Sequence, residues 1–106
     1  MNPAPPVTIA RTASYGTARM FVTFEGIDGS GKTTQARLLV EALQGEGRDV
    51  LATREPGGTE LGEEVRNILL DGVEVTAWAE AALFAAARAE LVEEVIAPAP
   101  RAMARV

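Results

Sequence analysis

The chain has 106 residues, which is enough for one small domain at most, and its apolar content is ordinary for a globular protein. Its formal net charge of −5 argues against a general nucleic-acid binder, and no apolar stretch approaches the length of a membrane span. Histidine and cysteine are absent, which removes the usual general base, disulfides and thiolate metal sites. We expect the chain to be cytoplasmic, and its chemistry to depend on phosphate positioning, carboxylates and arginines.

Residues 1–19 differ in composition from the rest of the chain. They carry a proline cluster at 3–6, and no acidic residue occurs before Glu25. The apolar run at 7–10 is too short for the core of a signal peptide. We expect a disordered leader, or translation from a start codon upstream of Met20, in preference to an organelle transit segment.

A complete phosphate-binding loop follows a predicted strand at residues 20–25 and opens a predicted helix near Lys32. In such a loop, successive backbone N–H groups surround the phosphates and the helix N-terminus contributes its positive pole. Lys32 is predicted to cover the β- and γ-oxygens of ATP, and the Thr33 hydroxyl is predicted to hold Mg²⁺. A glycine-rich turn without a ligand is the disfavoured alternative. The predicted phosphate-binding residues are Gly26, Ile27, Asp28, Gly29, Ser30, Gly31, Lys32, Thr33 and Thr34.

The pattern after this loop continues to alternate helix and strand. The helix from about Lys32 ends at Gly45 and Gly47. Residues 49–53 predict a second strand, and the proline and paired glycines at 55–59 predict a loop. This order of elements predicts an α/β fold with a parallel sheet and a right-handed crossover. The first helix has one apolar stripe, made of Ala36, Leu39, Val40 and Leu43.

Two further helices are predicted before the C-terminal residues. The longer one runs from an N-cap at Thr76 to Ile96, and the prolines at 98 and 100 stop it. Its Trp78 is expected to pack rather than to contact a ligand, and residues 98–106 are expected to form an irregular tail. The shorter helix runs from about Glu60 to Leu70, with inward-facing side chains at Leu61, Val65, Ile68 and Leu69.

Three separate motifs carry a resemblance to a known family. Residues 21–35 read FVTFEGIDGSGKTTQ, residues 53–59 read TREPGGT, and residues 84–90 read FAAARAE. In this order and spacing they closely resemble bacterial thymidylate kinase, over residues 20–96. The resemblance implies transfer of the γ-phosphoryl group of ATP, with Mg²⁺, to dTMP. It also implies the parallel sheet of P-loop nucleoside triphosphate hydrolases, which is incomplete here. The implied order of elements is strand–P-loop–helix–strand–helix–helix. Residues 20–97 would then form the N-terminal part of a nucleotide kinase domain.

The resemblance also assigns an acceptor site. It implies that Phe84 stacks on thymine and that Arg88, one helical turn away, hydrogen-bonds the base. Taken singly, Phe84 reads as core packing and Arg88 as a solvated charge. Glu55 resembles the family's acceptor-site carboxylate, and the bond that joins it to Pro56 is a candidate for the cis form.

Three further residues receive roles from the same comparison. Arg66 is implied to reach the acceptor phosphate. The alternative is an exposed ion pair with Glu63 or with another neighbouring carboxylate, without a role in binding. Asp28 is implied to hydrogen-bond the acceptor's sugar hydroxyl or metal-bound water, with a turn-favouring residue as its alternative. The implied catalytic residues are therefore Lys32, Asp28 and Arg66. Gly29 stands where some family members carry an arginine, which points to the variant whose catalytic arginines come from a distal lid. Arg54 either supports its loop or approaches phosphates.

The match is expected to stop after Ile96, where the family continues into a third strand that lies between the first two. About half of a typical family domain is present, so we expect the edges of the first two strands either to be exposed or to collapse onto each other. Marginal folding and little or no turnover are expected, as in a truncated or frameshifted product. A non-catalytic nucleotide-binding remnant and another nucleoside monophosphate kinase remain the alternatives. Expected partners are ATP and dTMP, without nucleic acid or membrane, and a homodimer follows only by family analogy.

Overall fold

The computed structural model describes the backbone of residues 8–11 and all of residues 20–106. The chain divides into two compact units. We call Met1–Ala52 with Pro100–Val106 the sheet unit, and Thr53–Ala99 the helix unit. The α/β class and the order of the helices agree with the sequence analysis, while the strand pairing differs from it.

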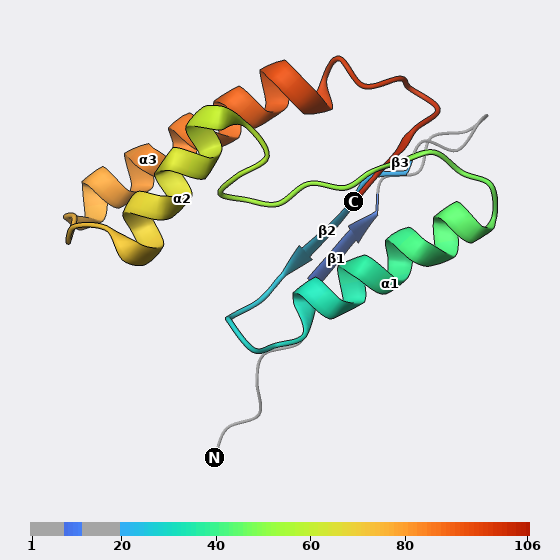
Figure 1. Cartoon of the computed structure of the whole chain (residues 1–106), viewed down its shortest axis with the longest axis horizontal. Helices are drawn as coiled ribbons and strands as arrows, with labels where there is room; N and C mark the ends of the chain where they lie inside the picture. Colours follow the sequence, from blue (N-terminus) through green and yellow to red (C-terminus); the bar gives the residue numbers. More distant parts are fainter. Residues whose placement is uncertain (1–7, 12–19) are drawn as a thin grey trace. The chain divides into compact units, whose positions relative to one another are not determined.

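The sheet unit contains two strand pairs and one helix. Strand β1 (Thr8–Arg11) runs antiparallel to β2 (Val22–Glu25), as Figure 1 shows, with Ile9 opposite Phe24. This pairing contradicts a disordered leader at 8–11, while 1–7 and 12–19 lie outside the described residues. Helix α1 (Lys32–Gly45) packs on β2 and on β3 (Val50–Leu51), and its Leu43 is buried.

The predicted irregular tail is wrong at its end, because β4 (Ala104–Arg105) is a strand parallel to β3. In β4, Ala104 N donates to Asp49 O at 2.9 Å and Arg105 N donates to Met20 O at 2.9 Å. A parallel bridge also joins Phe21 to Arg105, and Ala104 is fully buried. The C-terminal residues therefore pair with the chain on both sides of β4, because buried N–H and C=O groups require partners. These edges are not left open as the sequence analysis expected.

The helix unit is a pair of packed helices. Helix α2 (Glu60–Asp71) packs on α3 (Ala77–Leu91), with Val65 and Leu91 among the buried side chains. The hydroxyls of Thr59 and Thr76 cap the two helices. The predicted single helix to residue 96 is only partly correct, because α3 gives way to a π-helical turn, η1 (Val92–Ile96).

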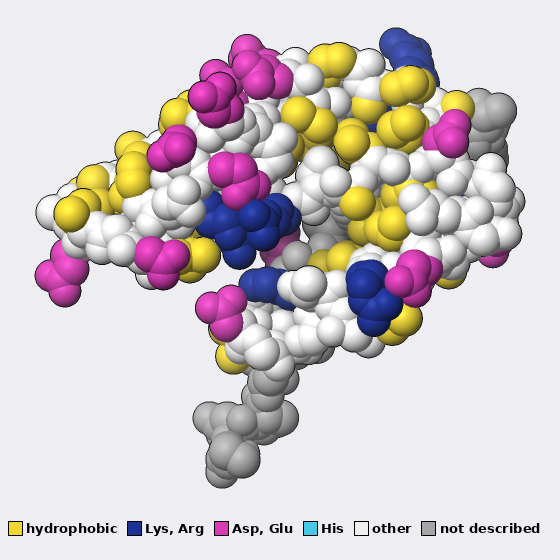
Figure 2. Space-filling view, viewed as in Figure 1, with side chains coloured by type: hydrophobic (Ala, Val, Ile, Leu, Met, Phe, Trp, Pro, Cys, Tyr) yellow, Lys and Arg dark blue, Asp and Glu magenta, His cyan; other side chains and the backbone are white. Residues whose placement is uncertain are grey.

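Two expectations about packing are also wrong. Trp78 is 87% exposed, and Leu61 and Ile68 of the predicted inward face are 42% and 37% exposed. For α2 the reason is that α3, its main packing partner among the described elements, covers a narrower strip than the apolar stripe supplies. Figure 2 shows apolar side chains among the acidic ones on the surface of the helix unit. None of the helices within the described residues combines the length and apolarity that a bilayer span needs.

Candidate functional site

The segment between β2 and α1 forms the loop that the sequence predicts. Its backbone turns through two glycines in the left-handed region, Gly29 at φ 81° and Gly31 at φ 91°. The first glycine of the loop is required by space, because a Cβ on Gly26 would lie 2.6 Å from the Ser30 Oγ. Residues with side chains could not follow this path without strain.

The loop leads directly into the N-terminus of α1. Gly31 is the N-cap residue, and Gln35 N donates to Gly31 O at 2.9 Å as the first helical bond. By helix geometry the N–H groups at 32–34 then have no acceptor within the helix. Among the described residues, no side chain caps this end. The helix start is therefore suited to an anion, because its N–H groups and positive pole face the loop.

Lys32 folds back over the loop. Its Nζ donates to Gly26 O at 2.6 Å and lies 3.8 Å from Asp28 Oδ1. The Asp28 side chain is fully exposed, so this ion pair is weak and the ammonium can exchange it for a phosphate. Within the described part of the chain, the Ser30 hydroxyl oxygen is buried and has no hydrogen bond to a protein group, so it can bond a ligand inside the loop.

A second loop, residues 54–59, connects the start of the helix unit to α2. The Glu55–Pro56 bond is cis, as the sequence analysis considered, and Gly57 and Gly58 have φ of 146° and 80°. From this loop Glu55 reaches α3 and accepts two bonds from Arg88, at 2.8 Å from Nε and 2.7 Å from Nη2. The carboxylate thus orients the guanidinium by a bidentate contact.

Three of the predicted acceptor residues line one cavity. Glu55, Phe84 and Arg88 border a cavity of about 650 Å³, together with Pro56. Phe84 is 43% exposed, so its ring is not simply core packing. Small side chains of α3 complete the wall, namely Ala81, Ala85, Ala87 and Ala89. The cavity therefore combines an aromatic ring, a cation and small apolar side chains, which suits a planar polar base.

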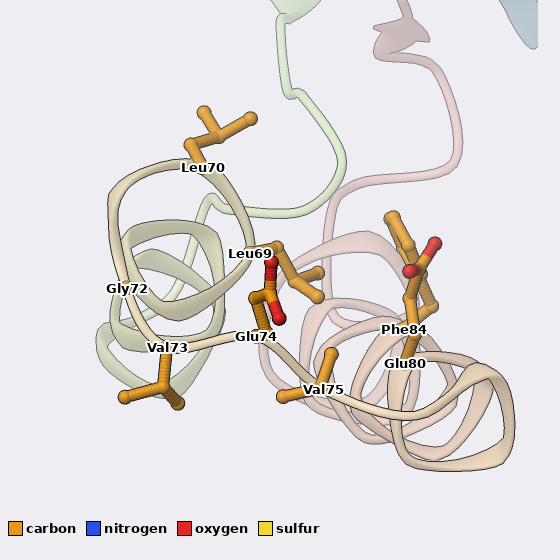
Figure 3. A pocket seen from close by; sticks show the side chains of 8 residues that line it. All are labelled: Leu69, Leu70, Gly72, Val73, Glu74, Val75, Glu80 and Phe84. Carbon is orange, nitrogen blue, oxygen red and sulfur yellow. The ribbon is translucent and has the colours of Figure 1, made fainter.

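The other predicted acceptor residues are placed differently. Arg66 on α2 donates from Nη1 to Pro56 O at 3.1 Å, and so holds the loop that carries Glu55. Asp28 belongs to the sheet unit. Phe84 also borders a second cavity of about 590 Å³, formed where α2 ends and α3 begins (Figure 3). That cavity has apolar walls with two carboxylates, Glu74 and Glu80.

Glu63 has a partner in this region that the sequence did not indicate, and the structure decides between the two roles expected for Arg54. Glu63 was considered only as a partner of Arg66, but it pairs with Arg54, with 2.8 Å between Nη2 and Oε2. Its Oε1 also accepts from Gly58 N at 3.0 Å. These bonds, from Arg54 first and Gly58 second, hold the pKa of Glu63 below its ordinary value. Arg54 therefore supports its loop. The sequence signal that could have indicated this contact is a glutamate in the first turn of α2, close after the paired glycines of the loop.

Comparison with known proteins identifies the family to which these two loops belong. The family model described as Thymidylate kinase matches residues 24–103, which is most of the chain. The chain belongs to the thymidylate kinase family. Its match continues past Ile96, where the sequence analysis expected it to stop, and reaches the residue before β4.

Individual relatives agree with the family model. A thymidylate kinase of Pelotomaculum thermopropionicum is 58% identical over 83 residues, which cover 76% of this chain and 38% of the relative. A thymidylate kinase of Thermosipho africanus is 58% identical over 80 residues, covering 74% of this chain and 40% of the relative. The chain therefore spans about two fifths of the length of the curated relatives that it matches.

Proposed function

We propose that this chain carries the nucleotide sites of a thymidylate kinase, which transfers the γ-phosphoryl group of ATP to dTMP to give ADP and dTDP. The observation that carries the proposal is the cavity in which Glu55, Phe84 and Arg88 meet, in a member of this family. The family also supports the P-loop nucleoside triphosphate hydrolase fold as the architecture of the complete domain.

The loop at 26–33 is proposed to bind the triphosphate of ATP. The helix N-terminus and the Lys32 ammonium supply the donors, and the buried Ser30 hydroxyl is available inside the loop. The Thr33 hydroxyl supplies a hard oxygen atom of the kind that Mg²⁺ prefers, so this residue fits the ion. When bound with ATP, Mg²⁺ neutralises phosphate charge.

The cavity of the helix unit is proposed to bind dTMP. Phe84 stacks on the thymine ring, and Arg88, which Glu55 orients, donates to the base carbonyl region. Arg66 supports the loop through Pro56 and is proposed to reach the acceptor phosphate when dTMP is bound. An arginine is suited to both tasks because its planar fork offers several donors.

The chemistry requires little beyond alignment and charge neutralisation. A phosphate oxygen of dTMP attacks the γ-phosphorus, the bond from the γ-phosphorus to the β,γ-bridging oxygen breaks, and ADP leaves. Lys32 stabilises negative charge on the β- and γ-oxygens, Arg66 offsets charge on the acceptor phosphate, and Asp28 orients the acceptor through its sugar hydroxyl or metal-bound water. The absence of histidine does not conflict with this scheme, since the attacking phosphate is already ionised at neutral pH.

Nucleotide binding by the 106-residue chain tests the proposal. Isothermal titration calorimetry is expected to show saturable binding of dTMP that is tighter than that of dUMP, CMP or AMP, and separate binding of Mg²⁺-ATP. A preference for one of the other monophosphates would instead identify another nucleoside monophosphate kinase. Formation of dTDP is measured separately, because binding without transfer would identify a non-catalytic nucleotide-binding chain. Failure of both nucleotides to bind would overturn the proposal.

Localisation, ligand class and oligomeric state are also part of the proposal. We propose a cytoplasmic protein whose ligands are ATP and dTMP rather than nucleic acid or membrane, in accordance with its net charge of −5. A homodimer is proposed from the family alone, and sedimentation velocity of the chain measures it.

A further inference from the structure

The loop at residues 54–59 is held to α2 at several points along the helix. The Thr59 hydroxyl accepts from Gly62 N at 2.9 Å and closes the first turn. Gly62 approaches so near that a Cβ on it would lie 2.7 Å from Gly57 O. One turn later, Arg66 donates to Pro56 O. The loop therefore has little freedom relative to α2, provided that its glycines keep their unusual backbone angles.

Glu63 lies at the centre of this attachment. One carboxylate oxygen accepts from Gly58 N at 3.0 Å and lies 3.4 Å from Arg54 Nε, and the other accepts from Arg54 Nη2 at 2.8 Å. A Cβ on Gly57 would lie 2.7 Å from Glu63 Oε1, so the carboxylate occupies space that a glycine leaves open. The same carboxylate thus joins both ends of the segment 54–58.

Glu55 lies within the segment that this contact closes, and its carboxylate binds Arg88 in the proposed dTMP cavity. Glu55 directly follows Arg54 in the chain, so the position of the Arg54 backbone sets where the Glu55 side chain begins. A loop released from Glu63 would let Glu55, and with it Arg88, leave the bidentate geometry.

We propose that Glu63 is a positioning residue for the acceptor nucleotide: by fixing residues 54–58, it holds Glu55 where it orients Arg88 toward the base. This inference rests on the proposed function and assigns to Glu63 no contact with either nucleotide.

The Arg54–Glu63 ion pair is exposed, and this distinguishes a positioning role for Glu63 from a role in global stability. The Arg54 and Glu63 side chains are 59% and 43% exposed, and ion pairs in such surroundings contribute little to global stability. The bond to Gly58 N acts locally, on a residue whose backbone has positive φ. Loss of the Glu63 charge should therefore affect dTMP binding far more than the unfolding temperature.

The test uses Glu63→Gln in the full chain, because glutamine keeps the size of the side chain and removes its charge. We expect the Kd for dTMP to rise roughly five- to tenfold, with the Kd for ATP and the thermal midpoint nearly unchanged. Glu64→Gln is the matched control, since Glu64 is the next residue of α2 and is exposed. It should leave all three quantities unchanged.

A double-mutant cycle identifies the route of the effect. Arg54→Met is expected to weaken dTMP binding, and the combined variant should bind no worse than the weaker single variant, because both substitutions remove one contact. Equal dTMP affinity of Glu63→Gln and the unmodified chain, or additive effects in the cycle, would overturn the positioning role and leave the proposed function intact. Absence of dTMP binding by the unmodified chain would overturn the proposed function, and this inference with it.

Discussion

Two glycine-bearing loops lead into helices in this chain. Among the described residues, side chains cap the backbone N–H groups at the second helix start but not at the first. The loop before α1 contains Gly29 and Gly31 at positive φ, and the loop before α2 contains Gly57 and Gly58 at positive φ. In the part of the chain that the structure describes, α1 has no side-chain cap, whereas Thr59 caps α2. Glu63 further accepts from a backbone N–H of the second loop.

The difference shows how similar backbone chemistry can serve two purposes. The first loop leaves N–H groups and the Lys32 ammonium for an external anion. The second loop satisfies its own groups from α2, and so becomes a fixed support for Glu55 and Arg88. In the proposed function, the main-chain site binds the phosphates, which every nucleotide has, and the side-chain site distinguishes one base from another.

The largest expected effect comes from removing the only charged donor of the first loop. Lys32→Ala should weaken ATP binding about 100-fold, because a charge-assisted contact to the phosphates is lost. Affinity for dTMP should stay the same. Displacement of a fluorescent ATP analogue measures the change, with Arg37→Ala, an exposed α1 residue, as the control. ATP binding that survives the Lys32 substitution would break the contrast between the loops.

Arg88 of α3, which the second loop orients through Glu55, offers a matching substitution in Arg88→Met. It should weaken dTMP binding about 30-fold, since the methionine keeps much of the side-chain length but offers no donor to the base. ATP binding should not change, and calorimetric titration with each nucleotide measures both affinities. Arg101→Met, at an exposed position of the sheet unit, is the control. Equal losses for the two arginines would argue against base recognition by Arg88.

Substituting alanine at the two ends of α1, at Gly31 and at Gly45, should change the free energy of unfolding in opposite directions. Gly31→Ala should destabilise by about 1–2 kcal/mol, because an alanine at φ 91° is strained. Gly45→Ala, at the end of α1 with open space around it, should stabilise by about 0.5–1 kcal/mol. Urea unfolding at pH 7 measures both. No loss of stability in Gly31→Ala would contradict the left-handed geometry at Gly31.

The cap that closes the second loop should make a smaller difference. Thr59→Ala is expected to cost about 1 kcal/mol, since Gly62 N loses its acceptor at 2.9 Å in a buried position. Thr76→Ala should cost less, because the corresponding bond from Ala79 N is long, at 3.4 Å. Thermal unfolding of the two variants measures this order, and a reversed order would show that the Thr59 cap is not the stronger one.

The smallest effect is a pH dependence that differs in sign between two carboxylates. The pKa of Glu63 is lowered by Arg54 and Gly58, so its stabilising contribution is present above the ordinary carboxyl pKa and is lost as pH falls through the lowered value. The pKa of Glu90 is raised by its hydrogen bond with Glu94, so protonation relieves a repulsion as pH falls. Thermal midpoints from pH 7 to pH 3 should fall less steeply in Glu63→Gln than in the unmodified chain, and more steeply in Glu90→Gln. Parallel curves would contradict both assignments.

Local signals made the first loop predictable, and distant partners made the rest difficult. Gly26, Gly29, Gly31 and Lys32 stand close together in sequence and encode their conformation directly. The cavity around Phe84 and Arg88 was predictable only from the family, because helical spacing shows that two residues share a face and not what covers it. The β4 pairing and the Arg54–Glu63 contact depend on long-range neighbours. The apolar stripe of α2 likewise gave no measure of how much of it α3 covers.

Nuclear magnetic resonance mapping of the two nucleotides on the labelled chain tests the central claim most directly. Mg²⁺-ATP should shift backbone amides of residues 26–34, while dTMP should shift those of Glu55, Gly57, Gly58 and residues 84–88. Each nucleotide should keep its own set of shifts when the other is added. Shifts by dTMP confined to residues 26–34, or no saturable shifts near Phe84 and Arg88, would contradict the account.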